Sequence, residues 1–412
     1  MILKFYGAAQ EVGRSAIVLK LDKTFMLDYG IKLGTEIQIP VSEPKIDALL
    51  LSHAHLDHSG DVPALYKDQD FPAFATNPTF KLSDLLLKDS INIAKKNRTK
   101  SQFNKKNLSK FKMMQRPKRY HSEFEFGNSR ISFHDAGHVC GSAITRIEND
   151  GKTIVYTGDF KLSHQLLHNG AEIVKSNVLI TESTYARKNH PVRDELTKQF
   201  IEKIKETLDN GGTALIPAFA VGRGQDILSM LEKNNLTPRV FLAGMIKKAS
   251  GIALNHKEFM SNPHLLENAM SHVEFIDKKH QKRILDEPAI ILTTAGMLNG
   301  GPVLKYIDKL PNNSHIFLTG YQVEGTNGRI LMDSGYIVDN GEKKKINTPY
   351  TFFDFSAHAD KNDLIEYAKK SSPETIVCVH GDKDNAVALA DDLREQGFDA
   401  YAPQLGETIK IE

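Results

Sequence analysis

The sequence contains no tryptophan and only two cysteines, Cys140 and Cys378, in 412 residues. Two cysteines cannot build the framework of several disulfides that holds small secreted domains together, so we expect buried thiols in a reducing cytoplasm. No apolar run approaches the roughly 20 residues that a membrane-spanning helix needs, which argues against a membrane partner. The N-terminus opens on a strand-like run without the features of a signal peptide, and this also favours the cytoplasm.

The chain also lacks a strong excess of either charge, with 53 Lys and Arg against 51 Asp and Glu. The net charge therefore does not by itself indicate a nucleic-acid-binding protein. One segment departs from this balance, because eleven Lys or Arg and no Asp or Glu lie between Lys95 and Arg119. Phe103, Phe111, Met113 and Met114 are interleaved with them. Two interpretations remain open, a surface that contacts phosphates or a solvated helical face with a few buried anchors.

A chain of this length exceeds one ordinary core and predicts two domains. The first part predicts a helix at Phe80–Lys96 and short strands joined by tight turns. After about residue 190, helices and strands alternate, a pattern typical of βαβ units and a parallel sheet. Residues suited to metal binding return near Phe355, so we expect the middle of the chain to be inserted into the first domain. The predicted strands of the first part are Ser15–Leu21, Thr24–Asp28, Ala48–Ser52, Ile131–His134, Ala143–Ile147, Lys152–Thr157 and Val178–Thr181.

The most informative motif is His53-Ala54-His55-Leu56-Asp57-His58, which follows an apolar run predicted to be a buried strand. Three imidazoles and a carboxylate in six residues are a costly density of polar groups at a strand end. Metal binding removes this cost, because both groups are good ligands for zinc-like ions. If the chain stays extended from His53 to His55, these two side chains lie on one side. Asp57 and His58 then lie beyond a turn and can serve a second ion.

Five further polar residues stand at the ends of predicted strands. They are Asp28, His138, Asp159, Glu182 and His380. Taken singly, each is a capping or turn residue as readily as a ligand. Because the carboxyl ends of neighbouring strands meet at one edge of a sheet, their recurrence favours a common site. The glycines beside several of them allow the backbone to turn sharply.

The order Asp28, His53–His58, His138 and Asp159 resembles the metallo-β-lactamase superfamily. Glu182, an inserted domain, His358 within Phe355–Asp360, and His380 resemble its β-CASP nucleases. Further matching stretches are Pro217–Arg223, Thr294–Leu298 and Gly320–Thr326. The resemblance implies an α/β fold, namely an αββα sandwich at 1–188 and 353–412 interrupted at 189–352 by a β-CASP α/β domain with a mainly parallel sheet.

The resemblance also implies roles for residues. His53, His55 and His138 would hold one zinc ion, Asp57, His58 and His380 the other, and Asp159 would bridge the two. Asp28 would orient a ligand imidazole. Asp57, Glu182 and His358 would be the catalytic residues, with His358 giving a proton to the leaving oxygen and Glu182 keeping that imidazole protonated.

A second predicted feature is a phosphate-binding helix start at Gly222, Arg223 and Gly224. Free backbone N–H groups at such a position, together with an arginine, bind anions. The alternative is an ordinary strand-to-helix turn with a solvated arginine. Lys247 and Arg329 are further candidates of the same kind.

The function that follows from the resemblance is a ribonuclease with two zinc ions that cleaves single-stranded RNA, as an endonuclease with or without 5′–3′ exonuclease activity. The motifs are most similar to the short archaeal or bacterial form of the cleavage and polyadenylation specificity factor endonuclease. The alternatives are a DNA nuclease of the same family, a metallo-hydrolase of lactams or thioesters, and an inactive structural subunit. In the DNA branch the position of His380 is usually small and apolar, and inactive relatives lose ligands. A homodimer is a further expectation, without assigned interface residues.

Overall fold

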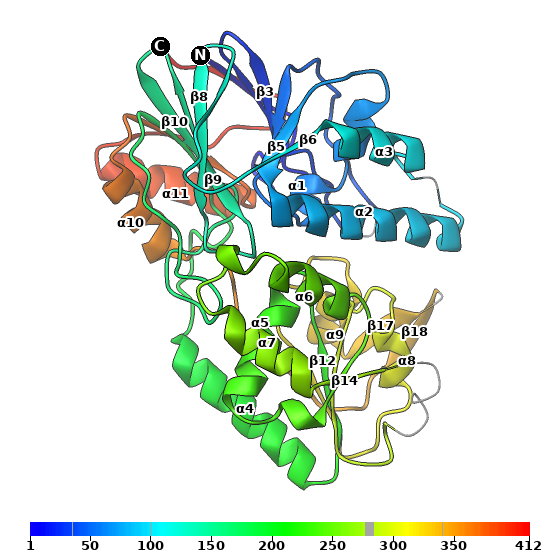
Figure 1. Cartoon of the computed structure of the whole chain (residues 1–412). Coiled ribbons are helices and arrows are strands. Elements are labelled where there is room, and N and C mark those ends of the chain that lie inside the picture. Colours follow the sequence, from blue (N-terminus) through cyan, green and yellow to red (C-terminus); the bar gives the residue numbers. More distant parts are fainter. Residues whose placement is uncertain (35, 100, 277–283, 340) are drawn as a thin grey trace. The chain divides into compact units, whose positions relative to one another are not determined.

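The computed structural model describes residues 1–34, 36–99, 101–276, 284–339 and 341–412 (Figure 1). The chain divides into two compact units, the first formed by residues 1–189 and 357–412 and the second by residues 190–356. The insert predicted from the sequence covers 189–352.

The first unit contains a sheet with the strand order β22-β1-β2-β3-β4-β5-β6. Strands β3 to β6 run parallel to one another, whereas β22, β1, β2 and β3 pair antiparallel. The carboxyl ends of β3 and β4 therefore lie side by side. The bounds are β1 (Ile2–Phe5), β2 (Ile17–Lys20), β3 (Thr24–Leu27), β4 (Ala48–Leu50), β5 (Ala73–Thr76), β6 (Gln115–Lys118) and β22 (Thr408–Lys410).

A second sheet of the same unit has the order β21-β20-β11-β10-β9-β8-β7. Strands β10, β11, β20 and β21 are parallel, and β7 to β10 form an antiparallel meander. The bounds are β7 (Phe124–Phe126), β8 (Ser129–Asp135), β9 (Ala143–Asn149), β10 (Lys152–Tyr156), β11 (Val178–Glu182), β20 (Thr375–Val379) and β21 (Asp399–Tyr401).

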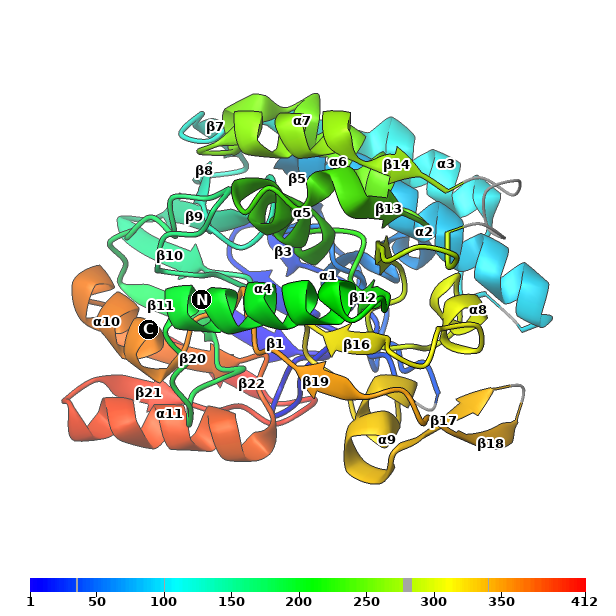
Figure 2. The same ribbon diagram turned by 90° about the horizontal axis from the view of Figure 1, so that it is seen from below.

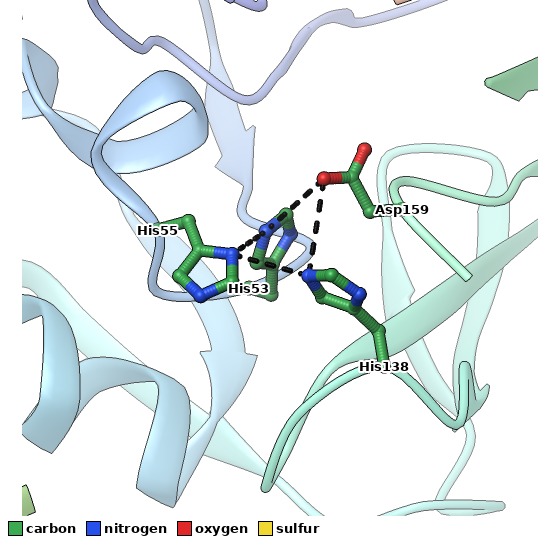
Figure 3. A group of neighbouring side chains, drawn as sticks. All are labelled: His53, His55, His138 and Asp159. Carbon is green, nitrogen blue, oxygen red and sulfur yellow. Dashed lines mark hydrogen bonds and ion pairs between the residues drawn. The ribbon is translucent and has the colours of Figure 1, made fainter. Parts of the chain in front are cut away.

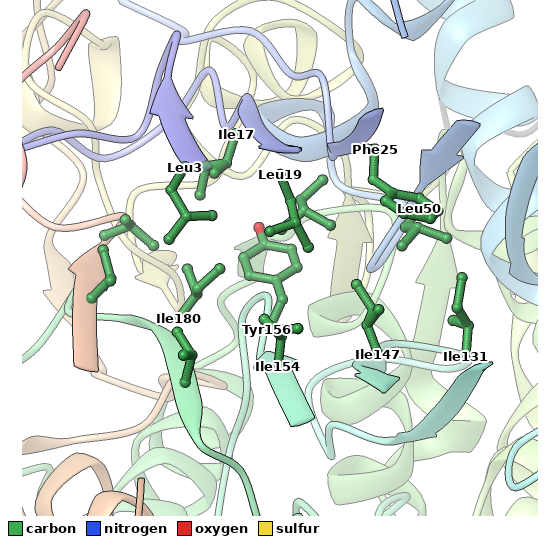
Figure 4. Close-up of a cluster of buried hydrophobic side chains, with 14 of the residues drawn as sticks. Leu3, Ile17, Leu19, Phe25, Leu50, Ile131, Ile147, Ile154, Tyr156 and Ile180 are labelled. Carbon is green, nitrogen blue, oxygen red and sulfur yellow. The ribbon is translucent and has the colours of Figure 1, made fainter. Parts of the chain in front are cut away.

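The two sheets of the first unit face each other across a core of alternating strand residues (Figure 4). Leu3, Ile17 and Phe25 point inward from the first sheet, and Ile147 and Ile180 point inward from the second. Each sheet buries its other face in a further hydrophobic cluster. Side chains from α2 (Asn77–Asn97) and α3 (Lys105–Met114) contribute to the outer cluster of the first sheet, and α10 (Lys361–Ser371) and α11 (Lys383–Glu395) to that of the second. This confirms the predicted αββα sandwich.

The second unit is built on a sheet with the order β14-β13-β15-β12-β16-β19, in which every pair is parallel. Its helices alternate with the strands, as predicted, and α9 packs beside a β17–β18 hairpin (Figure 2). The strands are β12 (Ala214–Pro217), β13 (Val240–Leu242), β14 (Glu274–Phe275), β15 (Ile290–Thr293), β16 (His315–Leu318), β17 (Tyr336–Asp339), β18 (Glu342–Lys345) and β19 (Tyr350–Phe352). The helices are α4 (Arg193–Asp209), α5 (Arg223–Lys233), α6 (Ile246–Leu254), α7 (Pro263–His272), α8 (Val303–Ile307) and α9 (Asn327–Ser334).

Helix α2 shows how local sequence sets an element's bounds. Thr76 ends β5 and caps the helix, because its side chain accepts a hydrogen bond from the backbone N–H of Thr79. Pro78 stands in the first turn, where its missing N–H costs nothing. Arg98 ends the helix in a left-handed conformation. Among the described residues, no helix combines the length and the apolar character that crossing a membrane requires.

Candidate metal centre

The predicted ligands lie where the strands of the first unit end. Asp28 directly follows β3, and the His53–His58 motif follows β4 and runs into the short helix α1 (Leu56–Ser59). In the second sheet, Asp159 follows β10, Glu182 is the last residue of β11 and His380 follows β20. Because β3 and β4 are parallel, as are β10, β11 and β20, these side chains gather at one edge of the sandwich.

Two glycines allow the segments to come this close. A Cβ on Gly30 would lie 1.8 Å from the backbone oxygen of Asp57, and one on Gly158 would lie 2.6 Å from Cβ of Ser52. Gly158 also has a φ of +54°, which a residue with a side chain rarely adopts. The glycine before Asp159 therefore serves both the turn and the contact between the two sheets.

A first group of possible ligand atoms comprises His53, His55, His138 and Asp159 (Figure 3). His55 Nδ1 lies 3.1 Å from both His53 Nε2 and His138 Nε2. Asp159 Oδ2 lies 3.6 Å from His53 Nε2 and 3.9 Å from His138 Nε2. Ligands held about 2.1 Å from a tetrahedral ion are separated by about 3.4 Å, so these spacings suit one zinc-sized ion.

A second group comprises Asp57, His58, Asp159 and His380. Asp159 Oδ1 lies 3.2 Å from His58 Nε2 and 3.1 Å from His380 Nδ1, and His380 Nε2 lies 3.5 Å from Asp57 Oδ2. Asp159 thus directs one oxygen to each group. The structure brings together all seven residues that the sequence assigned to metal binding.

Several atoms of these groups are buried without a hydrogen bond. They are His58 Nε2, both carboxylate oxygens of Asp159, and His380 Nε2. His58 Nε2 is close to Asp159 Oδ1, but the contact lacks the geometry of a hydrogen bond. Leaving buried polar atoms unsatisfied costs about 1–3 kcal/mol each. Metal ions at the two groups would remove this cost, so the residues present fit the ions that their chemistry implies.

Neighbouring polar groups fix the orientation of the imidazoles. Asp28 Oδ2 accepts from His58 Nδ1 at 2.7 Å, and the same carboxylate accepts from the backbone N–H and the hydroxyl of Ser52. The hydroxyl of Tyr156 also donates to Asp28, at 2.7 Å. Sequence reasoning placed Asp28 in this role but missed Ser52 and Tyr156, although each stands at or next to the end of a strand that leads to the site. His138 Nδ1 lies 2.9 Å from the backbone oxygen of Ala357, the residue at which the chain re-enters the first unit.

Burial and neighbouring charges set the protonation of the site. Burial lowers the pKa of His53 and His138 well below its usual range, and nearby imidazoles lower it further. Burial opposes the ionisation of Asp159, but the positive charges of His380 and His58 outweigh it and hold the pKa of Asp159 low. Burial would also lower the pKa of His58, but the negative charges of Asp159 and Asp28 raise it well above its usual range. Metal ions bind neutral imidazoles and ionised carboxylates, so His53, His138 and Asp159 are ready to bind, whereas His58 must release its proton when an ion binds.

Glu182 and His358 form a pair beside these groups. His358 Nδ1 lies 2.9 Å from Glu182 Oε2 and 3.8 Å from Asp159 Oδ2. The other oxygen of Glu182 accepts from the backbone N–H of Phe160 at 2.8 Å. Burial would lower the pKa of His358, but the negative charges of Glu182 and Asp159 raise it to about 9. Glu182 is fully buried, whereas His358 keeps 20% of its side chain exposed.

Three family models match the chain in succession. "Metallo-beta-lactamase superfamily" matches residues 11–203, "Beta-Casp domain" residues 225–331, and "Zn-dependent metallo-hydrolase RNA specificity domain" residues 345–403. A protein named probable RNase MJ4 from Methanocaldococcus jannaschii is 39% identical, and the match covers 100% of both chains. RNase aCSPSF2 from Saccharolobus solfataricus is 33% identical over 99% of this chain and 85% of its own. The chain belongs to the β-CASP family of the metallo-β-lactamase superfamily.

Other relatives of this β-CASP protein carry additional sequence. The transcription termination factor FttA from M. jannaschii is 34% identical over 99% of this chain and 71% of its own length. A solved structure of a protein of unknown function from Enterococcus faecalis V583 matches with a TM-score of 0.66 at 16% identity, covering 100% of this chain and 99% of that chain. The last comparison shows the fold alone. As a member of the superfamily, the chain has a metal-ion centre, for which the His and Asp groups are the candidates.

The predicted phosphate-binding residues of the second unit already have partners within the chain. The N–H groups of Gly222, Arg223 and Gly224 donate to Gln225 Oε1, the oxygen of Val221 and the oxygen of Phe219. The free N–H groups on which the prediction rested are therefore absent. Gly224 is instead needed for packing, because a Cβ there would lie 2.7 Å from the side chain of Ile246.

The three cationic side chains of that prediction also have partners within the chain. Arg223 is 8% exposed and donates to Asp226 at 2.6 Å, and Arg329 donates to Asp333 at 2.8 Å on the surface of α9. Lys247 Nζ lies 3.5 Å from the centroid of the Phe275 ring. A role for these residues in phosphate binding stays a prediction. It would require Arg223, Arg329 or Lys247 to leave its present partner and contact a phosphate instead.

The basic segment between Lys95 and Arg119 spans the end of α2, all of α3 and β6; position 100 lies outside the described residues. Phe103 and Phe111 are buried anchors, whereas Met113 is 75% exposed. A hollow beside α3 is lined by Lys67, Lys95, Lys105, Lys106 and Lys110 among its residues. Asp70 pairs with Lys110 and Glu43 with Lys67. The segment therefore has buried anchors, as one interpretation predicted, and also lysines gathered on one surface, as the other predicted.

Proposed function

We propose that this chain is a ribonuclease that uses two zinc ions to hydrolyse single-stranded RNA. The observation that carries the proposal is the position of Asp159, whose two oxygens face two separate ligand groups. A carboxylate shared in this way is typical of paired metal sites that hydrolyse phosphodiesters. The similarity to proteins named as RNases, and to a family model described as zinc-dependent and RNA-specific, supports both the metal and the substrate.

When bound, two divalent ions would supply a nucleophilic water and stabilise the negative charge that develops on the phosphate. The residues of the chain supply the rest. His53, His55 and His138 hold the first position, while Asp57, His58 and His380 hold the second. Asp28 and Ser52 keep His58 and the motif loop in place through their hydrogen bonds.

His358 is the proposed general acid. Glu182 binds Nδ1, so the proton for the leaving 3′-oxygen of the sugar would be given by Nε2. The negative charge of Glu182 favours the protonated imidazole, and the hydrogen bond from Phe160 fixes the carboxylate. Cleavage would leave a 5′-phosphate on one product and a 3′-hydroxyl on the other.

The residue at position 380 indicates the substrate class. RNA is favoured over DNA because His380 occupies the position that is usually small and apolar in the DNA-cleaving branch. Here His380 closes the second ligand group. An inactive structural subunit is disfavoured because every predicted ligand is present.

The deciding experiment uses RNA labelled at its 5′ or 3′ end, with a 5′-monophosphate or a 5′-triphosphate, and DNA of the same sequence. We expect internal cuts in RNA, 5′-phosphate products, and little cleavage of DNA. Cutting that advances only from a 5′-monophosphate would assign a 5′–3′ exonuclease. Preferential cleavage of DNA would contradict the substrate assignment.

Two controls separate the remaining alternatives. A chromogenic lactam and a glutathione thioester should be hydrolysed far more slowly than RNA, and the reverse order would identify a different metallo-hydrolase. Metal analysis of the purified protein should find at least two zinc ions per chain, and a metal-free but folded protein would support a structural role. The resemblance also predicts a homodimer, which light scattering on the purified chain would test.

A further inference from the structure

A cluster of possible metal ligands lies outside the Asp159 groups, within the first unit. It comprises His121, His134 and Glu172, which each offer one ligand atom, all within 4.8 Å of one another. His121 stands in the turn between β6 and β7, His134 lies on β8, and Glu172 lies between β10 and β11. None of the three was singled out by the sequence, and none belongs to the groups described above.

The geometry resembles that of the Asp159 groups. His121 Nε2 lies 3.3 Å from Glu172 Oε1, and His134 Nδ1 lies 3.4 Å from Glu172 Oε2. The two imidazole rings are 5.1 Å apart and nearly perpendicular, at 81°. Two nitrogens and a carboxylate at this spacing can surround one ion with bonds of about 2.1 Å, leaving a fourth position to water.

Neighbouring groups hold two of these side chains in place. His134 Nε2 lies 3.1 Å from the hydroxyl of Ser132, which leaves Nδ1 as the nitrogen directed at Glu172. Glu172 Oε1 accepts from the backbone N–H of Asp135 at 3.2 Å, and the N–H of Glu172 donates to the oxygen of Asp135 at 2.9 Å. Ligands that are oriented by such partners bind metal more tightly.

We propose that His121, His134 and Glu172 form a further binding site for a divalent transition-metal ion such as zinc, separate from the centre at Asp159. Two imidazoles and one carboxylate favour zinc or a similar borderline ion over magnesium or calcium, which prefer oxygen ligands. The side chain of His121 is 61% exposed, so the ion can enter from solvent and exchange with it.

The ion would tie together segments that lead to the main centre. Asp135 follows His134 and accepts from the N–H of Gly137, next to the ligand His138. The loop that carries Glu172 also contains Asp159, and the backbone N–H of Lys161 in this loop donates to the oxygen of Ala136. Metal at the His121 site therefore braces two loops that each supply a ligand to the Asp159 groups.

The competing interpretation is a cluster held by charge alone, with Glu172 accepting from protonated imidazoles. Equilibrium dialysis against zinc, with the metal counted per chain, distinguishes the two. We expect His121→Ala and Glu172→Gln to bind one ion fewer than the wild type. His164→Ala is the matched control, because His164 is an exposed histidine on the same loop as Glu172 and should leave the count unchanged.

Two further variants test the site by zinc binding alone, so the outcome does not depend on nuclease activity or on the loss of a folded protein. Ser132→Ala keeps all three ligands, and we expect it to weaken zinc binding at this site about 10-fold. In an Asp159→Ala background, His121→Ala should still remove one ion, which separates this site from the proposed catalytic one. Equal zinc counts in the wild type and in folded His121→Ala and Glu172→Gln would overturn the proposal, as would binding seen only at millimolar zinc.

Discussion

The strand ends of the first unit and the start of α5 in the second unit contain residues of equally suggestive kinds, but the side-chain atoms at the strand ends and the backbone N–H groups at α5 are in different states. At the strand ends, both oxygens of Asp159 and the Nε2 atoms of His58 and His380 are buried without hydrogen bonds. At the start of α5, the N–H groups of Gly222, Arg223 and Gly224 all donate within the chain. A binding site is better indicated by polar atoms that the fold leaves unsatisfied than by residue types alone.

The largest effect should come from Asp159, because both ligand groups share it. We expect Asp159→Ala to lower the rate of RNA cleavage by on the order of 10⁴-fold, since two ions each supplying several kcal/mol lose a ligand. Single-turnover cleavage and metal counting on the same sample measure the effect.

The matched control for this change is Asp150→Asn. Asp150 is exposed in the turn before β10 and has a left-handed φ of 49°, which asparagine tolerates. It should retain wild-type activity and metal content. An Asp159→Ala protein that kept its activity and its metal content would contradict the shared role of Asp159 in the two groups.

The next largest effect should come from His358, which lies beside the candidate ligand groups without being one of the seven predicted ligands. His358→Ala should slow cleavage by about 10²- to 10³-fold, because it removes the proposed proton donor. The metal content should stay at the wild-type value, which distinguishes a general acid from a ligand. Loss of an ion together with activity would assign His358 to metal binding instead.

A smaller effect is expected at Asp28, which contacts the site through His58, Ser52 and Tyr156. Asp28→Asn should weaken metal binding by about 10- to 100-fold. Tyr156→Phe removes one of the hydrogen bonds to Asp28 and should cost about 1 kcal/mol, or about fivefold. Competition with a metal chelator measures both, and equal affinities in both variants and the wild type would contradict the orienting role.

The smallest effects on RNA binding are expected in the second unit, where the donors are already engaged. Arg329→Gln removes an exposed, surface-paired arginine and should change KM for RNA by less than about twofold. Arg223→Gln disturbs a buried pair and should lower the free energy of unfolding by about 1–3 kcal/mol, measured by urea unfolding. A large rise in KM with unchanged stability in either variant would support the phosphate-binding prediction.

The elements that sequence predicted best are those with a strong local signal. Three kinds of element lie where they were expected. They are the buried strand before His53, the other short strands predicted for the first unit, and helix α2. Short elements such as β5, β6 and the hairpin β17–β18 were not predicted, because strands of a few residues gain their stability from neighbours in the sheet. The sequence of such a short strand does not show which neighbours it will pair with.

The start of α5 shows that one short motif can be compatible with two different structures. The sequence Gly222-Arg223-Gly224 is compatible with an open anion site and with a closed turn. Gln225 decides between them, because its side chain accepts from the N–H of Gly222 and donates to the oxygen of Ala220. Such side chain to backbone bonds depend on the conformation of the turn, which no residue type specifies by itself.

The sequence alone predicted the types of the candidate ligands and their gathering at one edge, because they follow strand-like runs and parallel strands end together. Only the tertiary structure decided which atoms meet. It turned the two oxygens of Asp159 toward different groups and brought His358 to within 2.9 Å of Glu182, across 176 positions. It also joined His121, His134 and Glu172, which share no motif. Contacts of this range are set by the packing of the two sheets, and local sequence patterns do not record them.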